Sequence, residues 1–171
     1  MNGDGNGWAA GPNGARLWGR FGAAGLLLVA PHTGEILLQH RAPWTACGGT
    51  WALPGGARDS HESPADAAVR EAVEETSLAP GLLRIHKVVT TAGPFDADPA
   101  RPELAGGWTY STVIATTTTQ QPLAVDPNEE SLELRWVHHD EVAGYPLLPA
   151  FSEAWETLAD EVRLLCEKGR H

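Results

Sequence analysis

The amino-acid sequence predicts an α/β sandwich, with a mixed sheet between helices. Several runs of apolar and β-branched residues have the length of strands, and they lie on both sides of a central segment with helical spacing. A second segment with helical spacing follows the last of these runs. Strands and helices in this order are typical of a layered α/β domain.

The first residues differ in composition from the rest of the chain. Residues 1–15, MNGDGNGWAAGPNGA, are rich in Gly and Asn and show no apolar period, so we expect a flexible tail. Residues 16–171 then form a single domain, since a chain of 171 residues is long enough for one sizeable core.

Five segments have the composition of strands. Gly22–Ala30 is continuously apolar, which indicates a strand buried on both faces. Trp108–Thr119 is rich in aromatic and β-branched residues and is the clearest strand in the chain. The five predicted strands are Gly22–Ala30, Glu35–Arg41, Leu82–Thr91, Trp108–Thr119 and Leu132–His139.

The central helix has clear start signals. Ser63 can cap it, Pro64 fits its first turn, and Asp66 stands where a capping box needs an acid. Helical spacing places small and apolar residues on a buried side and the three glutamates of this segment largely on the other. The predicted buried residues are Ala65, Ala68, Val69, Ala72, Val73 and Thr76, and the glutamates are Glu71, Glu74 and Glu75.

The last predicted element is an amphipathic helix over residues 148–169. Phe151, Trp155, Leu158, Val162 and Leu165 recur at helical spacing, so this helix packs one face on the core.

The three glutamates of the central helix need an explanation, because like charges at these spacings repel. A solvated acidic face is one reading. A metal site is the other, since the acids follow a sharp LPGG turn and lack interleaved bases apart from Arg70. Clustered oxygen ligands suit hard cations such as Mg²⁺ or Mn²⁺, and a bound cation would cancel the repulsion.

The segment from Gly56 to Leu78 resembles the Nudix box, GX5EX7REUXEEXGU, in which U is a bulky aliphatic residue. Gly56 matches its first glycine, Glu62 follows after five residues, and Arg70 and Glu71 follow after seven more. Glu74 and Glu75 supply the paired acids, and Leu78 the last aliphatic position.

Two positions depart from the pattern. Ala72 replaces a larger aliphatic residue, which implies slightly looser packing. Ser77 replaces the glycine that ends the helix in a left-handed conformation. A serine in that conformation costs on the order of 1 kcal/mol, unless the helix ends differently.

The resemblance implies a Nudix-type α/β/α sandwich and a pyrophosphohydrolase. Members of the family cleave the diphosphate of a nucleoside diphosphate linked to another group, with Mg²⁺ or Mn²⁺. By this resemblance Glu71 and Glu75 are the main metal ligands, Glu74 is a further ligand or base, and the carbonyl of Gly55 adds an oxygen. Arg70 would orient the glutamates by charge-assisted hydrogen bonds, and Glu62 would pair within the loop–helix unit.

Family members often take a base or an extra ligand from a loop before a late strand. DPNEESLELRW, residues 126–136, offers Glu129, Glu130 and Glu133, of which Glu130 is the favoured base. A solvated acidic loop explains these residues equally well.

The substrate-binding candidates are Arg41, which could meet a phosphate, together with Gly56 and Trp51. The aromatic residues that could stack on a base are Trp44, Trp51, Phe95, Trp108 and Tyr110, although each is more often a core residue. His138 and His139 are adjacent and would point to opposite faces of a strand, so they do not predict a metal pair.

The charge and composition of the chain limit which partners it can bind. A net charge of −10 argues against binding a nucleic acid polymer, which needs basic patches. The N-terminus lacks the basic residues and following apolar run of a signal peptide, and no apolar stretch is long enough to span a membrane. We therefore expect a cytoplasmic protein without membrane contact. The expected partner is a small nucleoside diphosphate-type molecule, and a homodimer is left open.

A non-catalytic nucleotide sensor or scaffold is the alternative function, and a helical interaction module with an acidic face is a third.

Overall fold

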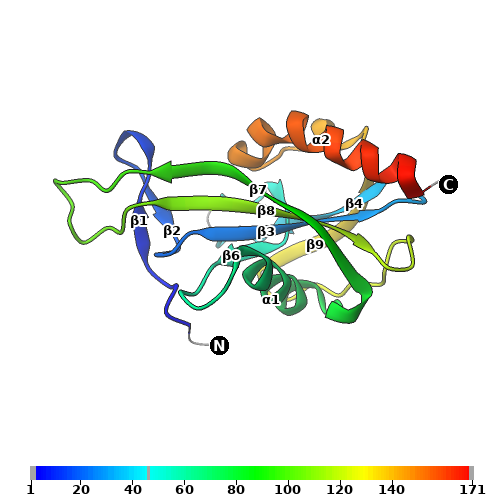
Figure 1. The fold of residues 1–171 in the computed structure, drawn as a ribbon, viewed down its shortest axis with the longest axis horizontal. Helices are drawn as coiled ribbons and strands as arrows, with labels where there is room; N and C mark the ends of the chain where they lie inside the picture. The colour runs from blue at the N-terminus through cyan, green and yellow to red at the C-terminus, as the bar shows by residue number, and fades with distance from the viewer. Residues whose placement is uncertain (1–2, 46, 170–171) are drawn as a thin grey trace.

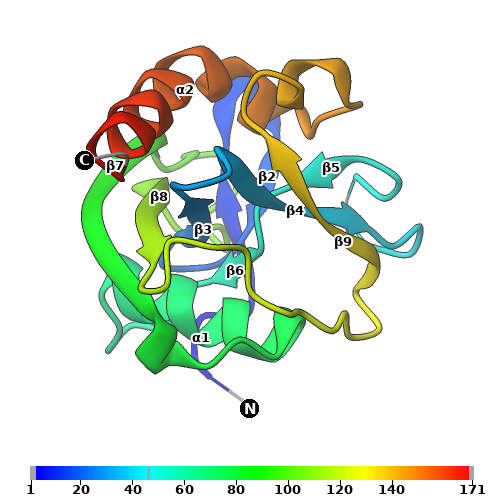
Figure 2. The ribbon, with the colours of Figure 1, turned by 90° about the vertical axis from the view of Figure 1, so that its right-hand side faces the viewer.

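The structure is a computed structural model, and it describes residues 3–45 and 47–169. Helix α1 (Pro64–Thr76) and helix α2 (Pro149–Gly169) cover opposite faces of a mixed β-sheet, as Figures 1 and 2 show. The predicted α/β/α sandwich is therefore confirmed.

The strands agree well with the segments that the sequence predicts. The long ones are β3 (Ala23–Ala30), β4 (Glu35–Arg41), β7 (Leu83–Phe95), β8 (Trp108–Thr117) and β9 (Ser131–His138). Four short strands were not predicted: β1 (Trp8–Ala10), β2 (Arg16–Trp18), β5 (Trp51–Ala52) and β6 (Gly55–Ala57). Single 3-10 turns occur at η1 (Pro12–Gly14), η2 (Pro80–Leu82) and η3 (Val142–Gly144).

The central strand β3 has three different neighbours. It pairs in parallel with β8 from Ala23 to Val29, and antiparallel with β4 only beside the turn that joins the two strands. At its other end it pairs with β6, while β4 pairs with β5 and β9. Since β6 lies just before helix α1, this topology brings the start of the predicted box to the middle of the sheet.

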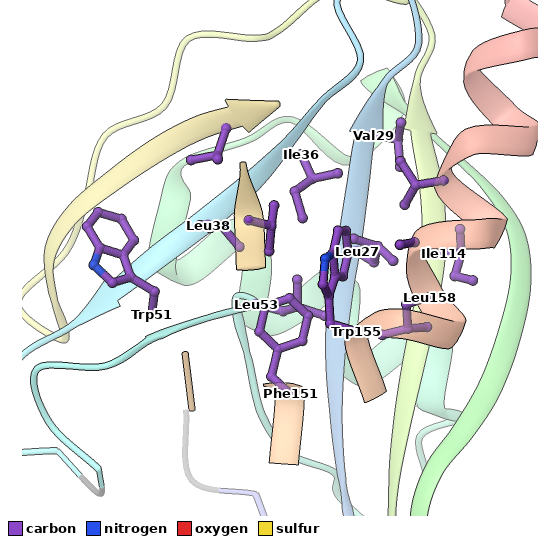
Figure 3. Close-up of a cluster of buried hydrophobic side chains, with 14 of the residues drawn as sticks. Leu27, Val29, Ile36, Leu38, Trp51, Leu53, Ile114, Phe151, Trp155 and Leu158 are labelled. Atoms are coloured by element: carbon purple, nitrogen blue, oxygen red, sulfur yellow. The ribbon is translucent and has the colours of Figure 1, made fainter. Parts of the chain in front are cut away.

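Strand β3 also divides the core into two layers. Leu26 and Leu28 pack toward the alanines of α1, and Leu27 and Val29 pack toward α2. Figure 3 shows the second layer, where Trp155 and Leu158 of α2 lie close to Leu27. The continuous apolar run is thus buried on both faces, as predicted, because alternate side chains point to opposite sides of a strand.

The prediction of a flexible tail over residues 1–15 was wrong for the residues that the structure describes. Strands β1 and β2 form an antiparallel hairpin in which Trp8 lies opposite Trp18. The Ala10 N–H donates to the Ala105 carbonyl at 2.8 Å, and Gly5 N–H donates to the Asp59 carboxylate at 2.8 Å. Figure 1 shows this hairpin beside the loop that joins β7 and β8. Residues 1 and 2 lie outside the described part of the chain.

Within residues 3–45 and 47–169, none of the helices has the length and hydropathy needed to cross a membrane.

Candidate active site

The segment that leads into helix α1 is held against the centre of the sheet. Gly55 lies opposite Gly25 of β3, and Gly56 lies opposite Ala24. A side chain at position 55 would collide with the β3 backbone, and one at position 56 would meet the carboxylate of Glu71. The two glycines therefore let β6 lie directly beside both the sheet and the helix carboxylates.

Helix α1 has well-defined ends. The Ser63 hydroxyl accepts a hydrogen bond from Asp66 N–H at 3.1 Å, and the Asp66 carboxylate accepts one from Ser63 N–H at 3.3 Å, which completes the predicted capping box. At the other end Ser77 has φ 62° and ψ 19°, a left-handed conformation. The serine therefore does what the expected glycine would do, at the cost of backbone strain.

Arg70 connects the loop to the helix. Its Nε and Nη2 donate to the two carboxylate oxygens of Glu62 at 2.7 and 2.8 Å, and its Nη1 donates to Glu71 Oε1 at 2.9 Å. Nη2 also donates to the Ala57 carbonyl at 3.0 Å. This bidentate pairing lowers the pKa of Glu62 and confirms that Glu62 pairs within the loop–helix unit.

The position of Glu75 differs from the prediction. Glu75 is only 3% exposed and shares the buried side of α1 with Ala68 and Ala72, instead of the solvent side. Its Oε2 accepts a hydrogen bond from Gly55 N–H at 2.9 Å. Burial, followed by the charges of Glu71 and Glu130, raises the pKa of Glu75 to about 9.

Glu71 and Glu74 lie progressively nearer to solvent. Burial raises the pKa of Glu71, although the Arg70 guanidinium opposes the shift. Glu74 is exposed and lies at the limit of an ion pair with Arg70, 3.9 Å from its Nη1. The three carboxylates therefore run from the buried to the exposed side of one helix.

Glu130 approaches these carboxylates from a different element. The loop before β9 is tied to the end of α1, because Asn128 N–H donates to the Glu75 carbonyl at 3.3 Å and its side chain donates to the Glu74 carbonyl at 3.3 Å. Asn128 Oδ1 then accepts from Glu130 N–H at 3.0 Å. The charge of Glu130 contributes to the raised pKa values of both Glu71 and Glu75, and all three residues line one cavity.

Most of the predicted site residues line one cavity of about 510 Å³. Glu129 and Glu133 do not line it, and Glu133 instead pairs with Arg135 at 2.7 Å. Trp51 does not line it either. The predicted residues that do are Arg41, Gly55, Gly56, Arg70, Glu71, Glu74, Glu75 and Glu130.

Comparison with known proteins assigns this arrangement to a family. The family model described as "NUDIX domain" matches residues 19–160. The chain belongs to the Nudix family. Nudix hydrolases generally use divalent metal ions, and the glutamates that line the acidic cavity lie within the matched residues.

Two similar proteins come from mycobacteria. The "Putative 8-oxo-dGTP diphosphatase 3" of Mycobacterium tuberculosis is 48% identical over 161 residues, which cover 92% of this chain and 70% of that protein. The structure of RenU, a Nudix hydrolase from M. smegmatis, is 50% identical with a TM-score of 0.81, and covers 94% of this chain and 96% of its own. The chain is therefore a Nudix pyrophosphohydrolase, which acts on phosphoanhydride bonds.

A more distant structure agrees with the fold alone. The C. elegans Ap4A hydrolase is 20% identical with a TM-score of 0.61, and the match covers 82% of this Nudix chain and 98% of the other.

The aromatic residues proposed for base stacking lie outside the cavity lining. Trp51 is 6% exposed and stacks on His40, with ring centroids 4.4 Å apart, so its indole is a core group. Trp108 is buried and Phe95 stacks on it at 6.0 Å, and the Tyr110 hydroxyl lies against Gly25. Trp44 is 70% exposed but does not line the cavity.

Two other tryptophans of the Nudix chain do line the cavity, and the sequence analysis did not select them. Both lie on the β1–β2 hairpin, Trp8 within the segment predicted as a tail and Trp18 three residues after its end. A signal was present, since GPNG between two short runs that each contain a tryptophan is typical of a turn between strands.

The prediction that the side chains of His138 and His139 point to opposite faces of a strand was also wrong. Strand β9 ends at His138, so His139 no longer follows strand alternation, and the two rings stack with centroids 4.3 Å apart. Asp140 lies 3.6 Å from Nδ1 of His138 and 3.2 Å from Nδ1 of His139. These three residues do not line the acidic cavity.

Proposed function

We propose that this Nudix hydrolase cleaves a pyrophosphate bond of a nucleoside diphosphate linked to a further group, in a reaction that depends on Mg²⁺ or Mn²⁺. Nucleoside triphosphates are the first substrates to test. The observation that carries the proposal is the convergence of four carboxylates, from Glu71, Glu74, Glu75 and Glu130, in one cavity large enough for a nucleotide.

The donor set fits a hard divalent cation. Burial, followed by the charges of Glu71 and Glu130, raises the pKa of Glu75 to about 9, and a cation among these carboxylates would stabilise their charged forms. Glu71, Glu74, Glu75 and the carbonyl of Gly55 would hold it. When bound, the cation would neutralise charge on the diphosphate and lower the pKa of a coordinated water.

The other residues of the cavity have separate tasks. Arg70 holds Glu71 in place through the 2.9 Å hydrogen bond and is itself fixed by Glu62. Glu130 accepts the proton of the attacking water, with Glu74 as the second candidate, because it faces the helix carboxylates from another element. Arg41 lines the same cavity and contacts a phosphate of the substrate.

The names of relatives support nucleotides as the substrate class. One relative is named as a putative 8-oxo-dGTP diphosphatase. Another, from Bifidobacterium longum, is named as a nucleoside triphosphate pyrophosphatase/Nudix hydrolase fusion protein; it is 37% identical over 163 residues, which cover 91% of this chain and only 31% of that protein. We therefore place 8-oxo-dGTP and the ordinary nucleoside triphosphates first, ahead of nucleotide sugars, ADP-ribose and dinucleoside polyphosphates.

A substrate panel tests the proposal. Release of phosphate or pyrophosphate is measured for each compound with Mg²⁺, with Mn²⁺ and with EDTA. We expect hydrolysis of at least one nucleotide with metal and none with EDTA. Glu75→Gln should lower kcat by at least roughly 100-fold, the scale of losing a catalytic electrostatic group. Glu129→Gln, outside the cavity, serves as the control. Full activity in Glu75→Gln would overturn the mechanism.

A further inference from the structure

The Trp8–Trp18 pair places a large aromatic surface at the acidic cavity. The two residues are 37% and 45% exposed, and both line the cavity that holds Glu71, Glu74 and Glu75. Their ring centroids are 5.0 Å apart with an angle of 78° between the planes. The two indoles therefore form a corner, in which a flat ring lying on one indole would meet the other one at an angle.

One ring face of this tryptophan corner is already covered by another side chain. The Arg16 guanidinium lies 4.1 Å from the centroid of the Trp8 ring, as in a cation–π contact. Trp18 is the more exposed of the two indoles. Trp18 is thus the better platform for a ligand, and Trp8 is the wall beside it.

The residues just before the hairpin are bonded to the loop before α1, whose Asp59 lines the cavity. Gly5 N–H donates to the Asp59 carboxylate at 2.8 Å, and Ser60 N–H donates to the Asp4 carboxylate at 2.8 Å, which ties the start of the chain to the loop before α1. Gly3 and Gly5 permit this approach, because a side chain at either position would collide with residues 58–59.

The opposite side of the hairpin is fixed as well. Ala10 N–H donates to the Ala105 carbonyl at 2.8 Å, and the Trp108 indole N–H donates to the Trp18 carbonyl at 3.1 Å. Since both sides are bonded to the domain, the tryptophans are positioned before any ligand arrives. Such preorganisation reduces the entropic cost of binding.

The chemistry of the two groups of residues is complementary. Carboxylates with a bound cation suit the diphosphate, whereas indole rings suit a flat aromatic group. A base stacks on an aromatic side chain without regard to hydrogen-bonding pattern, because every base has a π-face. A nucleotide carries both groups in one molecule, and a cavity of about 510 Å³ is within the usual size range for such ligands.

We propose that Trp8 and Trp18 form the subsite for the nucleobase, with the base stacked on Trp18, while the carboxylate end of the cavity takes the diphosphate. This assignment rests on the proposed function, because it takes the substrate to be a nucleotide. A cross-strand aromatic pair also stabilises a hairpin. That role alone does not require an open ring face at the cavity, and the two roles give different results on substitution.

The test compares ligands with and without a base. A purine nucleoside 5′-(α,β-methylene)triphosphate and methylenediphosphonate are titrated calorimetrically into the protein with Mg²⁺. The variants are Trp18→Leu and Trp18→Phe, since both side chains fill the hairpin but only Phe presents a flat ring. Trp44→Ala removes an exposed tryptophan that does not line the cavity and is the matched control.

We expect Trp18→Leu to weaken binding of the nucleoside analogue by roughly 5- to 150-fold, the range for loss of one stacking aromatic. Trp18→Phe should recover most of that affinity. Binding of methylenediphosphonate should not change in either variant, and Trp44→Ala should behave as wild type. Melting temperatures of all variants are measured in parallel, so that a purely structural role appears as a loss of stability that is not accompanied by a base-specific loss of affinity.

Three outcomes would overturn the subsite: equal affinity for the nucleoside analogue in Trp18→Leu and wild type, equal losses for both ligands, or no recovery with Phe. These results are distinguishable from failure of the proposed function. If the base-specific loss is seen but the substrate panel shows no hydrolysis, the subsite stands and the reaction does not. If hydrolysis is seen but Trp18→Leu leaves KM unchanged, the reaction stands and the subsite does not.

Discussion

A buried carboxyl group makes the stability of the metal-free protein depend on pH. The pKa of Glu75 is raised from 4.5 to about 9 in the folded state, so folding takes up a proton between these values. The free energy of unfolding must then fall as pH rises through this window, by up to about 1.4 kcal/mol per pH unit for one proton.

This gives a prediction for thermal unfolding in EDTA. The melting temperature of the wild type should decrease from about pH 5 to about pH 8, because more carboxylate must be buried in charged form. Glu75→Gln cannot titrate, so its melting temperature should fall less steeply and lie above that of wild type at about pH 8. Glu129→Gln, at an exposed position, should keep the wild-type slope. Equal slopes in Glu75→Gln and wild type would contradict the assignment.

A second prediction concerns Glu130. If it accepts a proton only in the transition state, Glu130→Gln should lower kcat by roughly 100-fold while KM for the nucleotide stays nearly unchanged. Steady-state kinetics with the best substrate of the panel measures both constants. Glu129→Gln and Glu133→Gln share the loop and its charge but lie outside the cavity lining, so they are the controls. A loss in KM alone would point to substrate binding instead.

The sequence was enough to select the glutamates of the candidate site, but not to predict how deeply each one is buried. Ala68, Ala72 and Glu75 follow the i, i+4, i+7 spacing of one helix face, so Glu75 lies on the stripe of buried alanines. The prediction placed Glu75 on the solvent side because a charged side chain is usually exposed. The tertiary contact with Gly55 of β6 gives the carboxylate a hydrogen-bond donor, and this contact cannot be predicted from the helix sequence.

At the scale of elements, helix α1 ends at a strained residue. Ser77 adopts a left-handed conformation in which glycine meets no steric penalty. Ser77→Gly should therefore raise the free energy of unfolding by up to about 1 kcal/mol, or about 2–4 °C in melting temperature for a domain of this size. Glu156→Gly, on an exposed face inside α2, should instead destabilise by about 0.5–1 kcal/mol. A destabilised Ser77→Gly would show that the conformation carries no strain.

Elements were predictable in proportion to their length. Strands such as β4 and β8 have enough residues for composition and alternation to be clear. The hairpin strands β1 and β2 have three residues each, and Gly and Asn around them resemble a linker. The GPNG turn between them is a local signal for a hairpin, but the contacts with Asp59 and Ala105 that hold this segment on the domain are far away in sequence, so no local pattern could predict those contacts.

At the scale of the whole molecule, the net charge of −10 complicates any measurement of metal binding. Added salt screens the mutual repulsion of the acidic groups and can stabilise the fold without any specific site. A cation held by the carboxylates of the cavity acts differently, because its effect saturates and depends on particular residues. Melting curves therefore need matched ionic strength.

Under that condition, Mg²⁺ or Mn²⁺ at millimolar concentration should raise the melting temperature. A ligand at about 100 times its Kd adds about 2.7 kcal/mol to the free energy of unfolding, which corresponds to about 5–10 °C for a domain of this size. Glu71→Gln and Glu75→Gln should each lose most of the increase, whereas Glu153→Gln, an exposed acid on α2, should keep it. The shift should also grow from about pH 5 to about pH 8, because the cation competes with the proton on Glu75. An increase that NaCl at equal ionic strength reproduces would mean that screening, and not a metal site among these carboxylates, stabilises the protein.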